Sequence, residues 1–137
     1  MRLFAGTGVL VLLALLLAGC GITEVGGGDE IPVVASERDD GSMYFEPKTV
    51  TVRPGEKVTF VVKNEGAVDH EFESNERGEA GIDEIIIPPG RTRRVNWTAP
   101  SEAGTYPIYC DLPGHRAAGM ELTLVVAEPA TPGGSAP

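Results

Sequence analysis

Four side chains of the types that bind transition metals lie in the second half of this 137-residue chain. One segment arranges a cysteine, a histidine and a methionine in the pattern C-x4-H-x4-M, at Cys110, His115 and Met120. The only other histidine of the chain is His70. A thiolate, two imidazoles and a weak axial thioether form the ligand set of blue-copper electron-transfer sites. We therefore expect these four residues to bind one copper ion, which could pass single electrons.

The residues between the ligands favour a compact loop. Pro113-Gly114 allows a tight reversal between the cysteine and the histidine, and Gly119 permits a close backbone approach just before the methionine. Cys110 is also the only cysteine outside the N-terminal segment. A thiol without a second cysteine to pair with suggests intermolecular pairing, reactivity or metal ligation, although cysteine can equally be a small core residue. Its neighbours here favour ligation.

Each candidate ligand also has an ordinary structural explanation. A single histidine is often a hydrogen-bonded core or surface residue, and Met120 could simply open a core strand. If one copper centre uses both histidines, none remains for the second centre of a copper oxidase or nitrite reductase, so we expect no enzyme. The binuclear copper site of oxidase subunit II needs two cysteines in the loop, and only Cys110 is there. A single thiolate with methionine is atypical of structural zinc. Copper storage or delivery without electron transfer stays open as the alternative.

The first 19 residues have the features of an export signal. Arg2 is followed by an uncharged apolar run from Val9 to Ala18. The run stops at Leu17-Ala18-Gly19-Cys20, which resembles the lipobox of bacterial lipoproteins. That resemblance implies lipidation of Cys20, export, and a membrane-anchored position on the extracytoplasmic side, in the periplasm or at the cell surface. The alternative is an uncleaved apolar helix that anchors the chain.

The remaining sequence divides into a body and two tails. Residues 20–30 are rich in glycine and polar residues and predict a flexible tether, whereas residues 128–137 predict a disordered tail. The body, residues 31–127, shows period-two alternation with frequent turn residues, which predicts an all-β sandwich of seven to eight strands. We expect a hairpin in which a turn at residues 53–56 joins the strands Thr49–Val52 and Lys57–Lys63. The other candidate strands are residues 31–36, 43–45, 70–73, 85–87, 92–98, 104–109 and 120–126.

Three segments of the body resemble the cupredoxins, the type 1 copper proteins that include plastocyanin, azurin and auracyanin. The segments are Tyr44 to Val58, Asn64 to Phe72 and Tyr106 to Met120. The resemblance covers residues 31–127, and the spacing of the ligand loop is most similar to those of auracyanin, rusticyanin and sulfocyanin. It implies a Greek-key β-sandwich with a metal at one end.

The resemblance also implies a role for each ligand. Cys110 would be the strong thiolate ligand, His70 and His115 would complete a trigonal plane, and Met120 would be axial. One position departs from the family, because a small polar residue that hydrogen-bonds near the sulfur often follows the first histidine. Here that residue is Glu71, whose carboxylate is a poor donor.

The net charge of −9 limits the possible partners. Such an acidic chain repels phosphate backbones, so we expect no nucleic-acid binding. We expect a monomer that exchanges electrons with a redox partner protein, such as a cytochrome or an oxidase. Apolar residues of the ligand loop could form the docking patch, with electrons passing through the exposed edge of His115; these residues are Leu112, Pro113, Ala117 and Ala118. They could equally be ordinary loop residues.

Overall fold

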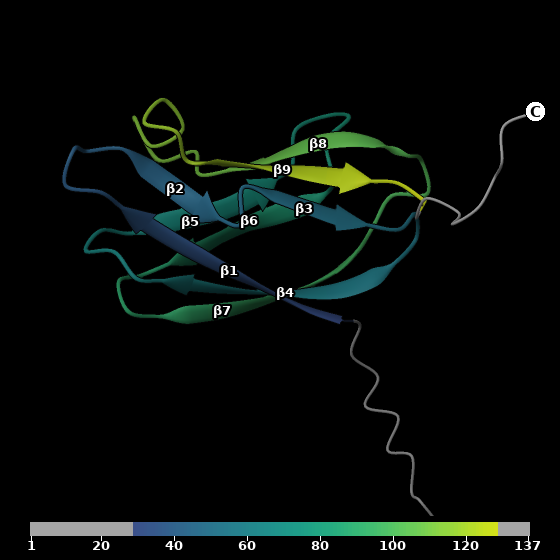
Figure 1. The fold of residues 1–137 in the computed structure, drawn as a ribbon, viewed down its shortest axis with the longest axis horizontal. Coiled ribbons are helices and arrows are strands. Elements are labelled where there is room, and N and C mark those ends of the chain that lie inside the picture. Colours follow the sequence, from purple (N-terminus) through teal and green to yellow (C-terminus); the bar gives the residue numbers. More distant parts are fainter. Residues whose placement is uncertain (1–28, 129–137) are drawn as a thin grey trace, which may run out of the picture.

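A computed structural model describes residues 29–128, which form nine strands in two sheets (Figure 1). The export signal, Cys20, residues 20–28 of the expected tether and residues 129–137 of the expected tail lie outside the described residues. The strands are β1 (Asp29–Glu37), β2 (Met43–Glu46), β3 (Thr49–Val52), β4 (Lys57–Asn64), β5 (His70–Ser74), β6 (Ile82–Ile87), β7 (Thr92–Thr98), β8 (Gly104–Tyr109) and β9 (Glu121–Val126).

One sheet has the strand order β2-β1-β4-β7 and the other the order β3-β9-β8-β5-β6. Two neighbouring pairs are parallel, β1 with β4 and β3 with β9, and the remaining pairs are antiparallel. The described residues contain no helix, and therefore none long and apolar enough to cross a membrane. The predicted all-β sandwich is confirmed, with nine strands where seven to eight were expected, and each candidate strand overlaps a strand of the structure. β1 starts at Asp29, inside the stretch expected as a tether.

The predicted hairpin of β3 and β4 is wrong. The turn itself forms, with the Glu56 amide donating to the Arg53 carbonyl at 3.1 Å. The strands on either side of it belong to different sheets, because β3 pairs with β9 while β4 pairs with β1 and β7. Val50 and Val52 on β3 and Val58 on β4 are buried. The turn thus carries the chain from one layer of the sandwich to the other, and both strands still bury their valines in the shared core.

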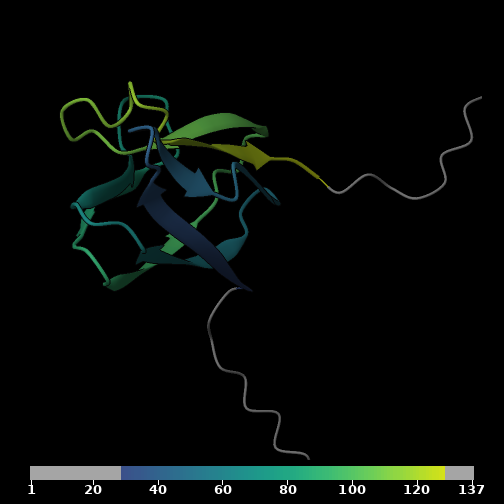
Figure 2. The same ribbon diagram turned by 60° about the vertical axis from the view of Figure 1, so that its left-hand side comes forward.

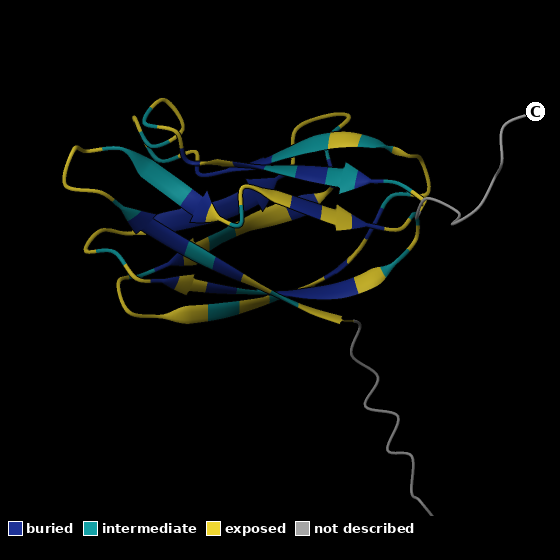
Figure 3. Cartoon of the chain, in the orientation of Figure 1, coloured by how far each residue is buried: buried dark blue, intermediate teal, exposed yellow. Residues whose placement is uncertain are grey.

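Aromatic side chains join the two sheets. Phe72 packs against Phe45 with ring centroids 5.5 Å apart and nearly perpendicular planes, and against Phe60 at 5.2 Å. Phe60 in turn contacts Trp97 at 5.7 Å. Buried residues alternate with more exposed ones along β3 and β9, whereas every residue of β5 is buried (Figure 3). Because Phe72 lies on β5 two residues after His70, this cluster also fixes the strand that carries one predicted ligand.

The two ends of the sandwich differ in what they carry. The loop between β8 and β9, which holds the predicted ligands, lies at the same end as the turn between β1 and β2 (Figure 1). The start of β1 at Asp29 and the end of β9 at Val126 lie at the opposite end, as the rotated view also shows (Figure 2). The ligand loop is therefore remote from both points where the described chain begins and ends.

Candidate metal centre

Two neighbouring strands and one loop bring three of the predicted ligands together. His70 is the first residue of β5, and Cys110 directly follows β8, which pairs with β5 at Glu73 and Tyr109. His115 lies in the loop that follows. One ligand atom from each of His70, Cys110 and His115 falls within 4.8 Å of the other two. Sheet pairing thus joins residues that are far apart in sequence.

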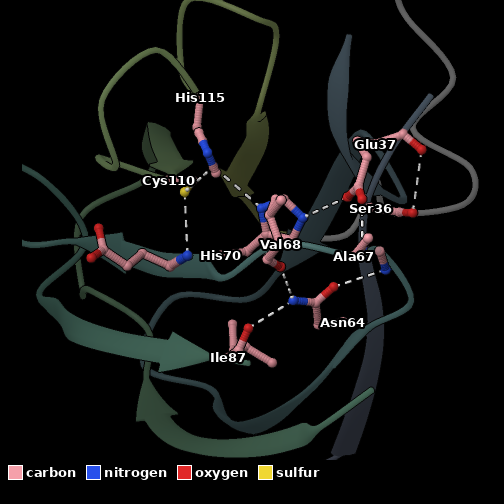
Figure 4. A network of polar contacts seen from close by, with 11 residues as sticks. Ser36, Glu37, Asn64, Ala67, Val68, His70, Ile87, Cys110 and His115 are labelled. Carbon is pink, nitrogen blue, oxygen red and sulfur yellow. Dashed lines mark hydrogen bonds and ion pairs between the residues drawn. The ribbon is translucent and has the colours of Figure 1, made fainter. Parts of the chain in front are cut away.

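The distances between these atoms fit a shared metal ion. The Nδ1 atoms of His70 and His115 are 3.3 Å apart, and the Cys110 Sγ is 3.3 Å from the His115 Nδ1 (Figure 4). Imidazole and thiolate ligands lie about 2.0–2.3 Å from a bound metal, so neighbouring ligand atoms around one ion are separated by about 3.3–3.8 Å. His70 and Cys110 are fully buried, whereas His115 is half-buried. The residues therefore fit a copper ion that is shielded on one side and reachable through His115.

Glycines give the ligand loop its shape, as the sequence predicts. Gly114 has φ of 86°, and the His115 amide donates to the Leu112 carbonyl at 3.0 Å, which closes the reversal. Gly119 has φ of 101°, and a Cβ there would lie 3.2 Å from the Met43 carbonyl oxygen. Both positions favour glycine, because other residues rarely adopt positive φ.

Met120 is fully buried at the end of this loop, immediately before β9. Its amide donates to the His115 carbonyl at 3.1 Å, and its carbonyl accepts from the Cys110 amide at 3.2 Å. These two bonds connect the backbone of the methionine to the backbones of both loop ligands. The position suits the expected axial ligand.

The sulfur receives a backbone hydrogen bond. The Glu71 amide donates to the Cys110 Sγ at 3.2 Å. The carboxylate that departs from the family pattern is therefore not needed as a donor near the sulfur. Burial raises the pKa of the Cys110 thiol, and the amides of Glu71 and Leu112 oppose that rise. A metal ion would have to displace the thiol proton.

Strand β5 carries two buried carboxylates close to Cys110. Glu71 and Glu73 are both buried, and burial is the main cause of the raised pKa of each. The nearby carboxylates of Glu84 and Asp111 raise both pKa values further. The surroundings of Cys110 are therefore acidic, which favours a bound cation and basic partners.

Sequence reasoning missed one residue of the site. The Nε2 atom of His70 is 3.2 Å from the Oε2 atom of Glu37, the last residue of β1. Burial lowers the pKa of His70 and Glu37 opposes this, so the imidazole is held mainly in the neutral form that binds metals. A hydrogen bond from the Ala67 amide is the main cause of the lowered pKa of Glu37. No motif marks Glu37, since a carboxylate at the end of a strand is ordinary in sequence.

Comparison with known proteins identifies the family. The model of the cupredoxin-like domain matches residues 9–126. The chain is 27% identical to the copper-resistant cuproprotein CopI of Pseudomonas aeruginosa, over 63% of this chain and 72% of that protein. It is 34% identical to the plastocyanin of Ulva prolifera, over 64% of this chain and 91% of that protein. The chain spans between 59% and 72% of the length of the CopI proteins that it matches.

A solved structure shows the same fold. Reduced auracyanin from Roseiflexus castenholzii matches with a TM-score of 0.59 and 24% identity, covering 75% of this chain and 100% of that one. The family match includes all nine strands and the whole ligand loop. This chain therefore belongs to the cupredoxin-like domain family.

Proposed function

We propose that this protein is a mononuclear type 1 copper protein that carries single electrons outside the cytoplasm. Its ligands would be His70, Cys110, His115 and Met120. The observation that carries the proposal is the convergence of two imidazole Nδ1 atoms and one cysteine sulfur at one end of the sandwich. Bound copper would supply a Cu(I)/Cu(II) couple, and a thiolate with imidazoles and a weak thioether tolerates both states.

The fold supports electron transfer by holding the ligands still. His70 belongs to a paired strand, and Cys110 is joined to Met120 by a backbone hydrogen bond. Ligands held in this way move little when the charge at the centre changes by one. Both histidines of the chain belong to this one centre, so we propose a carrier and not an enzyme.

The N-terminal sequence supports export and attachment to a membrane. We propose that residues 1–19 are removed as a signal peptide and that Cys20 receives a lipid. Several acyl chains together anchor a protein firmly, at roughly 0.8 kcal/mol per buried methylene. The folded domain, proposed to begin near residue 31 and end near residue 127, would then stand on the extracytoplasmic side as a tethered monomer.

Titration with copper tests the proposal. Addition of Cu(II) to the purified protein should produce an intense visible thiolate-to-copper band that saturates at one equivalent. The electron paramagnetic resonance spectrum should show the small hyperfine splitting of type 1 copper. A colourless adduct, or colour that needs several equivalents, would remove the electron-carrier assignment.

A role in copper resistance is the second candidate, because the CopI relatives carry that description in their names. The same ligands could store or deliver copper. The two roles differ in how fast copper leaves the protein. A carrier cycles rapidly between oxidation states and keeps its copper, whereas a delivery protein releases copper readily. Transfer of Cu(I) to a chelator within seconds, together with slow redox cycling, would favour the second candidate.

The Met120→Leu variant tests the axial ligand. Leucine has a similar volume, so the expected cost in stability is less than about 1.5 kcal/mol. The visible band should remain, because the thiolate and imidazoles are unchanged. The thioether stabilises the more highly charged Cu(II) more than it stabilises Cu(I). Its removal should therefore destabilise Cu(II) more, and the reduction potential should rise. An unchanged potential in voltammetry would remove Met120 from the ligand set.

The Ala117→Asp variant tests the proposed docking patch around His115. Ala117 and Pro113 are exposed, so an apolar partner surface could cover them. A c-type cytochrome with an apolar contact surface would bury this charge without a partner, and transfer to it should slow by about tenfold in stopped-flow measurements. Ser101→Asp adds the same charge in an exposed turn between β7 and β8, away from the loop, and is the control. Equal rates for the two variants would remove the patch from the mechanism.

A further inference from the structure

The contact between Glu37 and His70 joins the first sheet to the metal centre. Glu37 ends β1 in the four-stranded sheet, whereas His70 begins β5 in the five-stranded sheet. The His70 side chain is completely buried, and that of Glu37 is 24% exposed. The Nδ1 atom of His70 faces His115, and its Nε2 atom faces the carboxylate (Figure 4). The two ring nitrogens therefore have different partners.

The loop between β4 and β5 is shaped to receive this carboxylate. One oxygen of Glu37 accepts a hydrogen bond from the Ala67 amide, and the other faces His70. A side chain at Gly66 would overlap the Glu37 carboxylate, which lies directly against that backbone. Glycine at this position thus leaves room for the acid.

Hydrogen bonds of the Asn64 side chain also fix the loop between β4 and β5. Its Nδ2 group donates to the Val68 carbonyl at 2.7 Å and to the Ile87 carbonyl at 2.8 Å. Its Oδ1 atom accepts from the Gly66 amide at 2.8 Å. Asn64 is fully buried, and its bond to the Ile87 carbonyl is protected from water. The loop is fixed at both ends, and the carboxylate has little freedom to leave the imidazole.

We propose that Glu37 is a positioning residue of the copper centre, which fixes the Nε2–H tautomer of His70 and lowers the reduction potential. This inference rests on the proposed copper function. A carboxylate that accepts the outer N–H of a metal-bound imidazole orients the ring and increases its basicity. Its negative charge also stabilises Cu(II) more than Cu(I), because Cu(II) carries the larger positive charge.

The Glu37→Gln variant tests the effect on the potential. Glutamine replaces one of the two carboxylate oxygens with an NH2 donor, so either the Ala67 amide or the His70 ring would face a donor, and the side chain carries no charge. The ratio of Cu(II) to Cu(I) affinity should fall about tenfold, which corresponds to a rise of about 59 mV for a one-electron couple. Glu65→Gln is the matched control, because Glu65 is exposed, lies in the same loop region and pairs with Lys63. Its potential should stay at the wild-type value.

The metal-free wild-type protein supplies an independent test. Nitrogen-15 NMR of the His70 ring should show the proton on Nε2 and a free Nδ1. A proton on Nδ1, or equal potentials for Glu37→Gln and Glu65→Gln, would overturn the inference even if copper binds. A protein that binds no copper but shows the Nε2–H tautomer would instead overturn the proposed function and leave the positioning contact in place.

Discussion

Replacing Cys110 with serine is expected to abolish the visible band and to weaken copper binding by more than about a hundredfold. Loss of a hydrogen-bonding partner behind a ligand already costs about 10–100-fold in affinity, and Cys110 is itself the proposed strong ligand. Serine keeps a small polar side chain at the fully buried position beside the Glu71 amide. Absorption spectroscopy and competition with a copper chelator would measure both effects.

The matched control for this experiment is Ile108→Val, which changes another fully buried residue, two positions before Cys110, but leaves all four proposed ligands in place. Circular dichroism should show the same strand content for the wild type and both variants without metal. If the serine variant retains the wild-type visible band, the thiolate is not a ligand and the centre described above is wrong.

Phe72→Ala is expected to lower the free energy of unfolding by about 3–5 kcal/mol. The Phe72 ring is fully buried between Phe45 and Phe60 and joins the two sheets. Its removal leaves a cavity that these rigid neighbours can only partly fill. Because natural domains are stable by only 5–15 kcal/mol, this loss would be a large fraction of the total. Denaturant titration of the metal-free protein measures it directly.

Ile86→Ala provides the comparison for this prediction. Ile86 lies on β6 beside β5, but its side chain is 48% exposed, so its removal should change stability by less than about 0.5 kcal/mol. A loss below about 1 kcal/mol for the phenylalanine variant would mean that the aromatic cluster does not hold the sheets together. Copper added to the folded fraction should still give the visible band, since Phe72 contributes no ligand.

Local sequence patterns predicted the strands and three converging ligands well. Alternating and β-branched residues are a property of each strand alone, so Thr49–Val52 and Lys57–Lys63 could be recognised without knowledge of their neighbours, although β4 continues to Asn64, which was expected to break it. The ligand loop was recognisable because cysteine, histidine and methionine are rare here and lie close together in sequence. These features depend on short stretches of chain.

Pairing between strands was harder to predict, because it depends on distant residues. A short turn between two alternating stretches usually makes a hairpin, yet β3 pairs in parallel with β9 at the far end of the chain. β6 begins at Ile82, earlier than its apolar run, because its polar Asp83 and Glu84 face solvent. The contact of Glu37 with His70 crosses between sheets and has no local signal.

The start of β1 and the ligand loop lie at opposite ends of the sandwich, which affects how far the histidines would stand from a surface to which the N-terminal side is attached. β1 runs from Asp29 to Glu37, over roughly 26 Å at about 3.3 Å per residue, and ends beside the histidines. If the chain is attached through its N-terminal side, the strand acts as a spacer that lifts His115 away from the attachment point. The folded domain then contributes about one strand length to the separation between the attachment point and the imidazole edge that a redox partner in the same surface would have to reach.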